Sequence, residues 1–334
     1  MRIFGCAIVL IVIASTGHGV QAKAPDAGPI PNHAAVARNS LPGPTEGSAT
    51  PTPAEKGVRL AQNIAVDPLV ATSGNPAFPP LTWVGMLVIP SPSKRNPDSL
   101  TLCTAEFIAP TVLLTAAHCL RDLPDSIDDN PDGPPHKWPD ITKATFYRQY
   151  QNDSGEPFKI VCGLTNPKWT LPPKVGGMTS AQKQVAMNKA SQHDYAMLLV
   201  DSPNPGGGMP YMLDWKGKKG TTFAIRVGYP GAILDAAIVQ QVPGSVFFAN
   251  TIPDPYDRMR NEVVQWGPSV DATQGMSGGA WIINFDTTGK KPDANTLIAV
   301  SSYANSDFPG ASFAAYLTAE EFNPLLKSVS NGCK

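Results

Sequence analysis

The sequence predicts an all-β protein, and three features of the chain carry that prediction. From Leu81 onwards, short apolar runs rich in β-branched and aromatic residues follow one another. Clusters of Pro, Gly and Asp separate these runs, as turns separate strands. Helical periodicity is almost absent between the runs. Such a chain is expected to form antiparallel barrels or sandwiches.

The expected strands fall into two sets along the chain. The first set comprises residues 82–89, 101–108, 111–116, 144–150, 158–164 and 195–200. A polar connection rich in glycine follows it. The second set comprises residues 221–229, 236–242, 245–250, 262–266, 280–285, 296–303 and 312–317. Two β-domains are therefore expected, at residues 76–205 and 206–317.

Helices are expected in only two places. Residues 318–334 are expected to form a C-terminal helix and tail, in which Thr318 is the N-cap and Glu321 follows three residues later. Pro324 would weaken the middle of this helix, because proline lacks the amide hydrogen that a helix interior uses. A second helix is expected within residues 179–191.

The N-terminus has the pattern of a secretory signal peptide, residues 1–22. Arg2 precedes an apolar run over residues 3–14, and small residues lead to a cleavage position after Ala22. The run is shorter than the roughly 20 apolar residues that span a bilayer. Residues 23–75 form a leader or pro-segment rich in Pro and Ala, with little apolar surface to bury in its first part. Secretion is therefore expected, outside the cell or into the periplasm, with no membrane association after signal removal.

Composition limits the classes of partner and cofactor. The chain carries 26 basic and 27 acidic residues, so it has no excess of charge for binding nucleic acid. Removal of the signal peptide leaves four cysteines, Cys103, Cys119, Cys162 and Cys333. An even set in an exported chain predicts two disulfides. A zinc site is the competing interpretation, but the chain has no CxxC pair, and no metal or cofactor is expected.

Ser277 is the candidate nucleophile, within the sequence TQGMSGGAW of residues 273–281. The letters GMSGG also satisfy the GxSxG pattern of α/β-hydrolases, whose histidine follows the serine. In this chain every histidine precedes Ser277: His18, His33, His118, His136 and His193. That order excludes an α/β-hydrolase. A subtilisin-like order would need an alternating α/β chain, so the order His, Asp, Ser remains.

Three segments present such an order. CTAEFIAPTVLLTAAHCL places His118 directly after an expected strand, HDYAMLLVD places Asp194 at the start of another, and QGMSGGA contains Ser277. Over roughly residues 80–330 the chain thereby resembles trypsin-like serine peptidases of the chymotrypsin fold. The VGYPG sequence at residues 227–231 is similar to the secreted bacterial branch that includes glutamyl endopeptidases of the V8 type. His193 is interpreted as a surface neighbour of Asp194.

The resemblance implies a fold and a set of roles. It implies two packed six-stranded antiparallel β-barrels with a C-terminal helix, and a secreted serine endopeptidase that acts on proteins or peptides as a monomer. His118 would be the general base, Asp194 would orient its imidazole, and Ser277 would attack the substrate. The backbone amides of Gly275 and Ser277 would form the oxyanion hole.

The disulfide pairing is also implied by the resemblance. Cys103 and Cys119 stand where a bond would fix the histidine segment beside its strand. Chymotrypsin-like chains return their C-terminal helix towards the first barrel, which implies a second bond between Cys162 and Cys333.

The substrate pocket implied by the resemblance has an acidic floor. Asp271 stands six residues before Ser277, as the aspartate of the DSCQGDS sequence does in trypsins. Specificity for Arg or Lys is therefore expected. The implied pocket walls are Ser302, Tyr303, Ala304 and Gly310. The alternative is that Asp271 bonds local backbone, which would leave the pocket to another side chain.

One departure from the family pattern concerns activation. Met276 stands where zymogens of this family carry the aspartate that binds a newly cut N-terminus. Because Met276 offers an ammonium group no partner, activity is expected not to depend on such a terminus. Two rival functions share the scaffold, a catalytically silent binding protein and an esterase.

Overall fold

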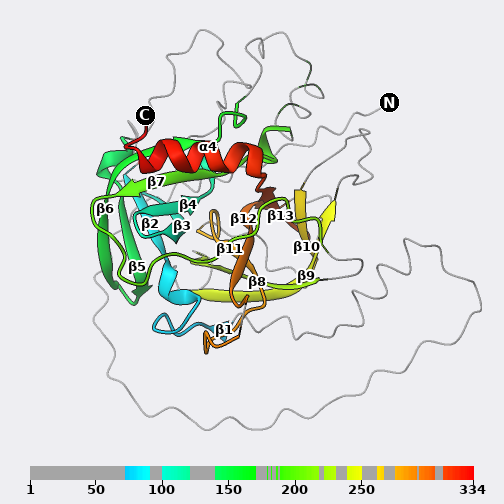
Figure 1. Ribbon diagram of the computed structural model, residues 1–334, viewed down its shortest axis with the longest axis horizontal. Helices are drawn as coiled ribbons and strands as arrows, with labels where there is room; N and C mark the ends of the chain where they lie inside the picture. Colours follow the sequence, from blue (N-terminus) through cyan, green and yellow to red (C-terminus); the bar gives the residue numbers. More distant parts are fainter. Residues whose placement is uncertain are drawn as a thin grey trace, which may run out of the picture. The chain divides into compact units, whose positions relative to one another are not determined.

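The computed structural model describes most of the expected β-domains. The described residues are 72–90, 100–120, 140–170, 179, 182, 186, 189–217, 222–230, 239–249, 262–266, 275–291, 293–304 and 311–334. The expected signal peptide, residues 23–71 of the leader and the pocket residues Asp271 and Gly310 lie outside this set. Figure 1 shows the described strands and the C-terminal helix as ribbons.

The first barrel is made from six strands. They are β2 (Val84–Pro90), β3 (Leu100–Ala109), β4 (Val112–Thr115), β5 (Thr145–Gln151), β6 (Ser154–Thr165) and β7 (Ala196–Val200). Their order around the closed barrel is β2-β3-β4-β7-β6-β5, and every pairing is antiparallel. The expected strands of the first set therefore all form.

The second barrel is closed in the same way. Its strands are β8 (Thr222–Gly228), β9 (Gln240–Ala249), β10 (Glu262–Trp266), β11 (Ala280–Ile283), β12 (Thr296–Ala304) and β13 (Ala311–Tyr316). They follow the order β9-β10-β13-β12-β11-β8, and β8 pairs with β9 to close the ring. The short β1 (Thr72–Ser73), at the end of the expected leader, pairs with the first residues of β9. Two closed six-stranded antiparallel barrels confirm the predicted fold class.

Strand β9 corrects the expected division of the second set. Two strands were expected, at residues 236–242 and 245–250, because Pro243 and Gly244 look like a break. The structure has one strand through both, opposite Ile225 and Ala224 of β8. Gly244 is needed there because an added Cβ would lie 2.7 Å from Cγ of the buried Gln265. A side chain from β10 fills the space that glycine leaves.

Aromatic side chains fill the first barrel. Phe107, Phe146 and Phe158 come from β3, β5 and β6, and each is at most 2% exposed. The ring of Phe107 makes edge-on contacts with both others, at centroid distances of 5.4 and 5.1 Å. Full burial of a side chain of this size contributes about 1.5–3 kcal/mol. Strands β3 and β6 pair with β4 and β7, next to which His118 and Asp194 lie in the chain.

The C-terminal helix α4 (Ala319–Ser330) forms as expected, but its start differs from a capping box. The Thr318 side chain makes no capping hydrogen bond, and the Glu321 carboxylate contacts His193 instead. Pro324 lies inside the helix without ending it. The helix lies against β6 and β7 of the first barrel (Figure 1). Its apolar side chains, including Phe322, are buried there, and this packing outweighs the hydrogen bond that proline loses.

The second expected helix is described only in part. Gln182, Ala186 and Lys189–Ser191 are helical, and the rest of residues 179–191 lies outside the described set, apart from Thr179. In the described part of the chain, no helix combines the length and the apolar character that crossing a bilayer requires.

Glu106 is a buried carboxyl group that sequence patterns did not reveal. It lies on β3, it is 0% exposed, and neither carboxylate oxygen has a hydrogen-bond partner among the described residues. Burial raises the pKa of Glu106 well above the model-peptide value of 4.5. The folded protein therefore holds a proton here at pH values where the unfolded chain releases it.

We expect the stability of the Glu106→Met variant, relative to the wild type, to be greater at pH 8 than at pH 4. Because the folded-state pKa is raised, Glu106 lowers the free energy of unfolding as the pH rises above 4.5, by at most about 1.4 kcal/mol per pH unit up to the folded pKa. Urea unfolding of the two proteins at several pH values measures the difference. Parallel stability curves for the two proteins would contradict this expectation.

Candidate active site

His118 is held at the end of a barrel strand. It lies in the short helix α2 (Ala117–Leu120), which begins two residues after the end of β4. The Cys103–Cys119 disulfide joins this helix to β3, and the second predicted disulfide, Cys162–Cys333, is also present. The His118 side chain is 29% exposed, so a substrate can reach its ring. Burial of the neighbouring Ala117 and Cys119 leaves the ring as the part of this turn that faces outwards.

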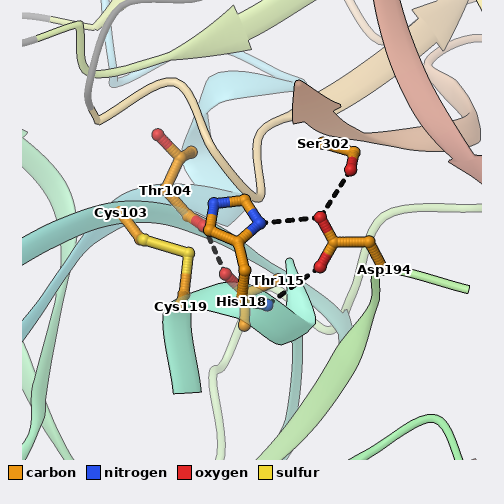
Figure 2. A network of polar contacts seen from close by, with 7 residues as sticks. All are labelled: Cys103, Thr104, Thr115, His118, Cys119, Asp194 and Ser302. Carbon is orange, nitrogen blue, oxygen red and sulfur yellow. Dashed lines mark hydrogen bonds and ion pairs between the residues drawn. A yellow bond between two sulfur atoms is a disulfide. The ribbon is translucent and has the colours of Figure 1, made fainter. Parts of the chain in front are cut away.

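Asp194 contacts His118 twice, as Figure 2 shows. One carboxylate oxygen, Oδ1, accepts a hydrogen bond from the His118 backbone amide at 2.9 Å. The other, Oδ2, lies 2.7 Å from Nδ1 of the His118 ring and also accepts from the Ser302 hydroxyl. Asp194 is only 1% exposed, so these contacts are little weakened by water. The carboxylate favours the tautomer that carries a proton on Nδ1, which leaves Nε2 as the basic nitrogen.

Ser277 lies in a loop that β3 fastens through Thr104. The Thr104 amide donates to the Ser277 carbonyl at 2.8 Å, and the Thr104 hydroxyl donates to the Gly275 carbonyl at 2.6 Å. Gly275 has a φ of 96°, a backbone conformation that side chains disfavour. The Ser277 side chain remains partly exposed. The loop is thus fixed by its backbone, while the serine side chain can face solvent.

Gly278 brings this loop against the turn that precedes His118. A Cβ added to Gly278 would lie 2.2 Å from the Thr104 carbonyl oxygen and from the Thr115 hydroxyl, and 2.9 Å from the Ala116 amide nitrogen. Its φ of 84° also lies in the region that favours glycine. Glycine is therefore required for the close approach. The structure brings the Ser277 loop and the His118 turn together.

Two adjacent serines of β12 join the Ser277 loop to Asp194. The Ser301 carbonyl accepts from the Gly278 amide, and the Ser301 amide donates to the Gly279 carbonyl, both at 2.9 Å. The next residue, Ser302, donates its hydroxyl to Asp194. Sequence reasoning assigned Ser302 only to the pocket wall and missed this contact. The sequence feature that could have indicated this contact is the pair of serines that follows the apolar residues 297–300 of the strand.

The other expected pocket residues are described only in part. Tyr303 is partly buried and its ring stacks on Phe313, with a centroid distance of 4.8 Å and an interplanar angle of 8°. The backbone of Ala304 ends β12. Asp271 and Gly310 lie outside the described residues, so the acidic pocket floor stays a prediction.

The amides expected to form the oxyanion hole donate no hydrogen bond to any described residue. These are the amides of Gly275 and Ser277. Between them Met276 is buried, and its sulfur lies next to Gly228, where an added Cβ would be 2.9 Å away. An apolar side chain thus occupies the position at which zymogens of the resembled family carry an aspartate.

Metal-binding clusters are absent from the part of the chain that the structure describes: no three His, Cys, Asp or Glu side chains gather there. Cys119, beside His118, is bonded to Cys103 and has no free thiolate for zinc.

Two solved structures share the fold of this chain. A crystal structure of the thermostable serine protease AL20, from an extremophilic microorganism, aligns with a TM-score of 0.50 and 16% identity, and covers 75% of this chain and 97% of its own. The HL collagenase structure aligns with a TM-score of 0.50 and 15% identity, over 76% of this chain and 94% of its own. The chain has the chymotrypsin fold.

A further solved structure also resembles the chain. A Glu endopeptidase in complex with MPD aligns with a TM-score of 0.49 and 17% identity, over 78% of this chain and 96% of its own. No family model and no curated protein matches the sequence. The fold is shown by the two barrels and by the two structures with a TM-score of 0.50, whereas activity has to be argued from the site.

Proposed function

We propose that this chain is a secreted serine endopeptidase that hydrolyses peptide bonds through an acyl-enzyme, with His118, Asp194 and Ser277 as its triad. The observation that supports this most is the meeting of three segments. Asp194 contacts His118 through both carboxylate oxygens, and Gly278 lies against the turn before His118. The order and spacing of the three motifs in the sequence give independent support.

In the proposed reaction, Ser277 Oγ attacks the carbonyl carbon of the scissile peptide bond while its proton passes to Nε2 of His118. Asp194 stabilises the imidazolium that forms, through its contact with Nδ1. His118 then gives the proton to the leaving amine, the carbon–nitrogen bond breaks, and the acyl group stays on Ser277. Water attacks this ester with His118 again as the base, which releases the carboxylic acid and restores the serine.

The developing oxyanion would be bound by the amides of Gly275 and Ser277. The lack of another acceptor for them among the described residues supports this role. Fixed donors of this kind each contribute about 10²–10³ in rate. The hydrogen bonds from the Thr104 amide and hydroxyl and from the Ser301 backbone hold the loop before substrate arrives, so no reorganisation is needed during the reaction.

We also propose that the chain acts on proteins or peptides, that it is secreted and that it is a monomer. Two disulfides agree with an oxidising compartment, and the N-terminal pattern supplies a signal for export. The chemistry needs no metal or cofactor, because the protein supplies both the base and the oxyanion donors.

Reaction with a fluorophosphonate probe tests this function. The probe phosphonylates an activated serine, so labelling of Ser277 and cleavage of peptides are expected. Absence of labelling in folded protein would favour the silent binding protein. Hydrolysis of simple esters without hydrolysis of peptides would favour the esterase.

We further propose that the pocket prefers Arg or Lys on the acyl side of the cleaved bond, through Asp271. We expect the Asp271→Ser variant to lose its preference for Arg, because a carboxylate at the pocket floor needs a cationic partner. Peptides that differ only at this residue measure the preference as a ratio of kcat/KM values. Equal or better cleavage by the wild type after Phe, Leu or Glu would contradict the proposal.

A further inference from the structure

A cluster of polar side chains lies beside the 193–195 turn that contains Asp194, between the first barrel and helix α4. It consists of Glu321 from the first turn of α4, Asn166 and Lys168 after β6, and His193 before β7. We call it the α4 anchor. One oxygen of Glu321 accepts from His193 Nδ1 at 2.8 Å and from the Asn166 side chain at 2.7 Å. The other pairs with the Lys168 ammonium at 2.5 Å.

The Glu321 charge is nearly buried, with 9% of its side chain exposed. Burial raises the pKa of Glu321, but hydrogen bonds from His193, Lys168 and Asn166 outweigh it and lower the pKa to about 2. Glu321 is therefore an anion throughout the pH range in which a peptidase would work. Three donors from the first barrel converge on one anion of the helix, which makes this a defined point of attachment.

The α4 anchor holds the backbone on both sides of Asp194. His193, the residue before Asp194, is bound through its ring, and its carbonyl accepts from the Tyr195 amide at 2.8 Å. The carbonyl of Tyr195, the residue after Asp194, accepts from the Asn166 amide at 2.9 Å. The tight turn at residues 193–195 is thus fixed from one side by the anchor, while the Asp194 carboxylate reaches His118 on the other.

A role in helix stability alone does not account for this geometry. Glu321 stands three residues after Thr318, where a capping-box glutamate would turn back to the Thr318 amide. Its carboxylate is engaged by the first barrel instead. The neighbouring Glu320 is exposed and already places a negative charge in the first turn, where it complements the helix dipole.

Helix α4 is attached to the first barrel at its other end as well. Cys333, three residues after the helix, is bonded to Cys162 of β6. The same strand leads into Asn166 and Lys168, which bind Glu321 at the helix start. Both ends of α4 are therefore tied to one strand of the barrel. This makes the helix a firm support for the residues that it contacts.

We propose that Glu321 is a positioning residue for Asp194: through His193 and Asn166 it fixes the 193–195 turn so that the carboxylate meets both the amide and the ring of His118. This inference rests on the proposed function, because it matters for catalysis only if His118 and Asp194 act in a triad. A displacement of catalytic groups by about 1 Å can cost roughly 10²-fold in rate, so loosening this turn affects turnover more than substrate binding.

The test compares Glu321→Gln with the matched variant Glu320→Gln, which removes the same charge from the same helical turn. Glu321→Gln is expected to lower kcat for a peptide substrate by roughly 10- to 100-fold, with KM within about twofold of the wild type. Glu320→Gln is expected to change neither. Equal effects of the two variants, or a change in KM alone, would overturn the inference.

Two further measurements separate positioning from loss of folding. The proton between Nδ1 of His118 and Asp194, whose atoms lie 2.7 Å apart, is expected to give a low-field ¹H NMR signal in the absence of substrate. This signal is expected to shift or broaden in Glu321→Gln and to stay in place in Glu320→Gln. His193→Asn keeps an amide donor at the place of the ring Nδ1 and is expected to retain more kcat than His193→Ala. An unchanged signal, or equal losses in the two His193 variants, would overturn the inference.

The outcomes also distinguish this inference from the proposed function. If the wild type does not hydrolyse peptides or label with the fluorophosphonate, the proposed function fails, whatever the Glu321 variant does. If the wild type is active and Glu321→Gln retains wild-type kcat and the wild-type low-field signal, only the positioning role of Glu321 fails.

Discussion

Replacement of Ser277 by alanine is expected to abolish peptide hydrolysis, with a loss in kcat on the order of 10⁶-fold, as for a serine peptidase without its nucleophile. The acyl group then has no oxygen to which it can be transferred. His118→Ala is expected to cause a similar loss, and the double variant little more, because triad residues act as a unit. Initial rates on a fluorogenic peptide, together with fluorophosphonate labelling, measure the effect.

The Ser277→Ala protein is expected to remain folded. The contacts that hold this loop use backbone atoms, namely the Ser277 carbonyl bound by Thr104 and the Gly278 and Gly279 groups bound by Ser301. Alanine preserves all of them. Thermal unfolding near the wild-type temperature would show that lost activity is chemical and not structural. A variant that is folded and still hydrolyses peptides at the wild-type rate would refute the assignment of the nucleophile.

Replacement of Asp194 by asparagine is expected to lower kcat by about 10⁴-fold. Both carboxylate oxygens now accept hydrogen bonds, Oδ1 from the His118 amide and Oδ2 from the His118 ring and Ser302. An amide nitrogen at Oδ1 would face the His118 amide, donor against donor. An amide nitrogen at Oδ2 would donate to Nδ1 and move the ring proton to Nε2, so His118 could no longer act as a base.

Ser302→Ala is the matched control for Asp194→Asn. It removes one donor from Oδ2 and leaves the contacts of His118 with Asp194 in place, so a much smaller loss of kcat is expected. The kcat of each variant is compared at the same pH, with circular dichroism as a check of folding. An Asp194→Asn protein within tenfold of wild-type activity would contradict the role proposed for Asp194.

Local patterns predicted the strands well and their boundaries less well. Alternating and continuous apolar runs, each ended by turn residues, located the strands of both barrels. The division of β9 was wrong because Pro243 and Gly244 were read as a break. The side chain of Gln265 on β10 occupies the space above Gly244, and β9 continues through both residues. Such a compensation depends on a neighbouring strand and leaves no local signal.

The supports of the site were harder to predict than its candidate residues. His118, Asp194 and Ser277 stand in motifs with recognisable neighbours. Ser302 and Glu321 carry no motif, and each contacts a residue more than 100 positions away in the chain. His193, interpreted as a surface neighbour, binds Glu321 and has a side chain only 23% exposed. Contacts over such separations arise only when the barrels close and α4 packs.

The sequence by itself determined the fold class, the order of the candidate triad and the exclusion of an α/β-hydrolase, because apolar periodicity and residue order are properties of the linear chain. Only the tertiary structure decided how Asp194 is held and why Gly278 has to be glycine. It also decided that the Glu321 carboxylate binds residues of the first barrel and does not cap its own helix. These features depend on distances between segments that are remote in sequence. Such distances are set by the packing of two closed barrels and one helix, and no local pattern encodes them.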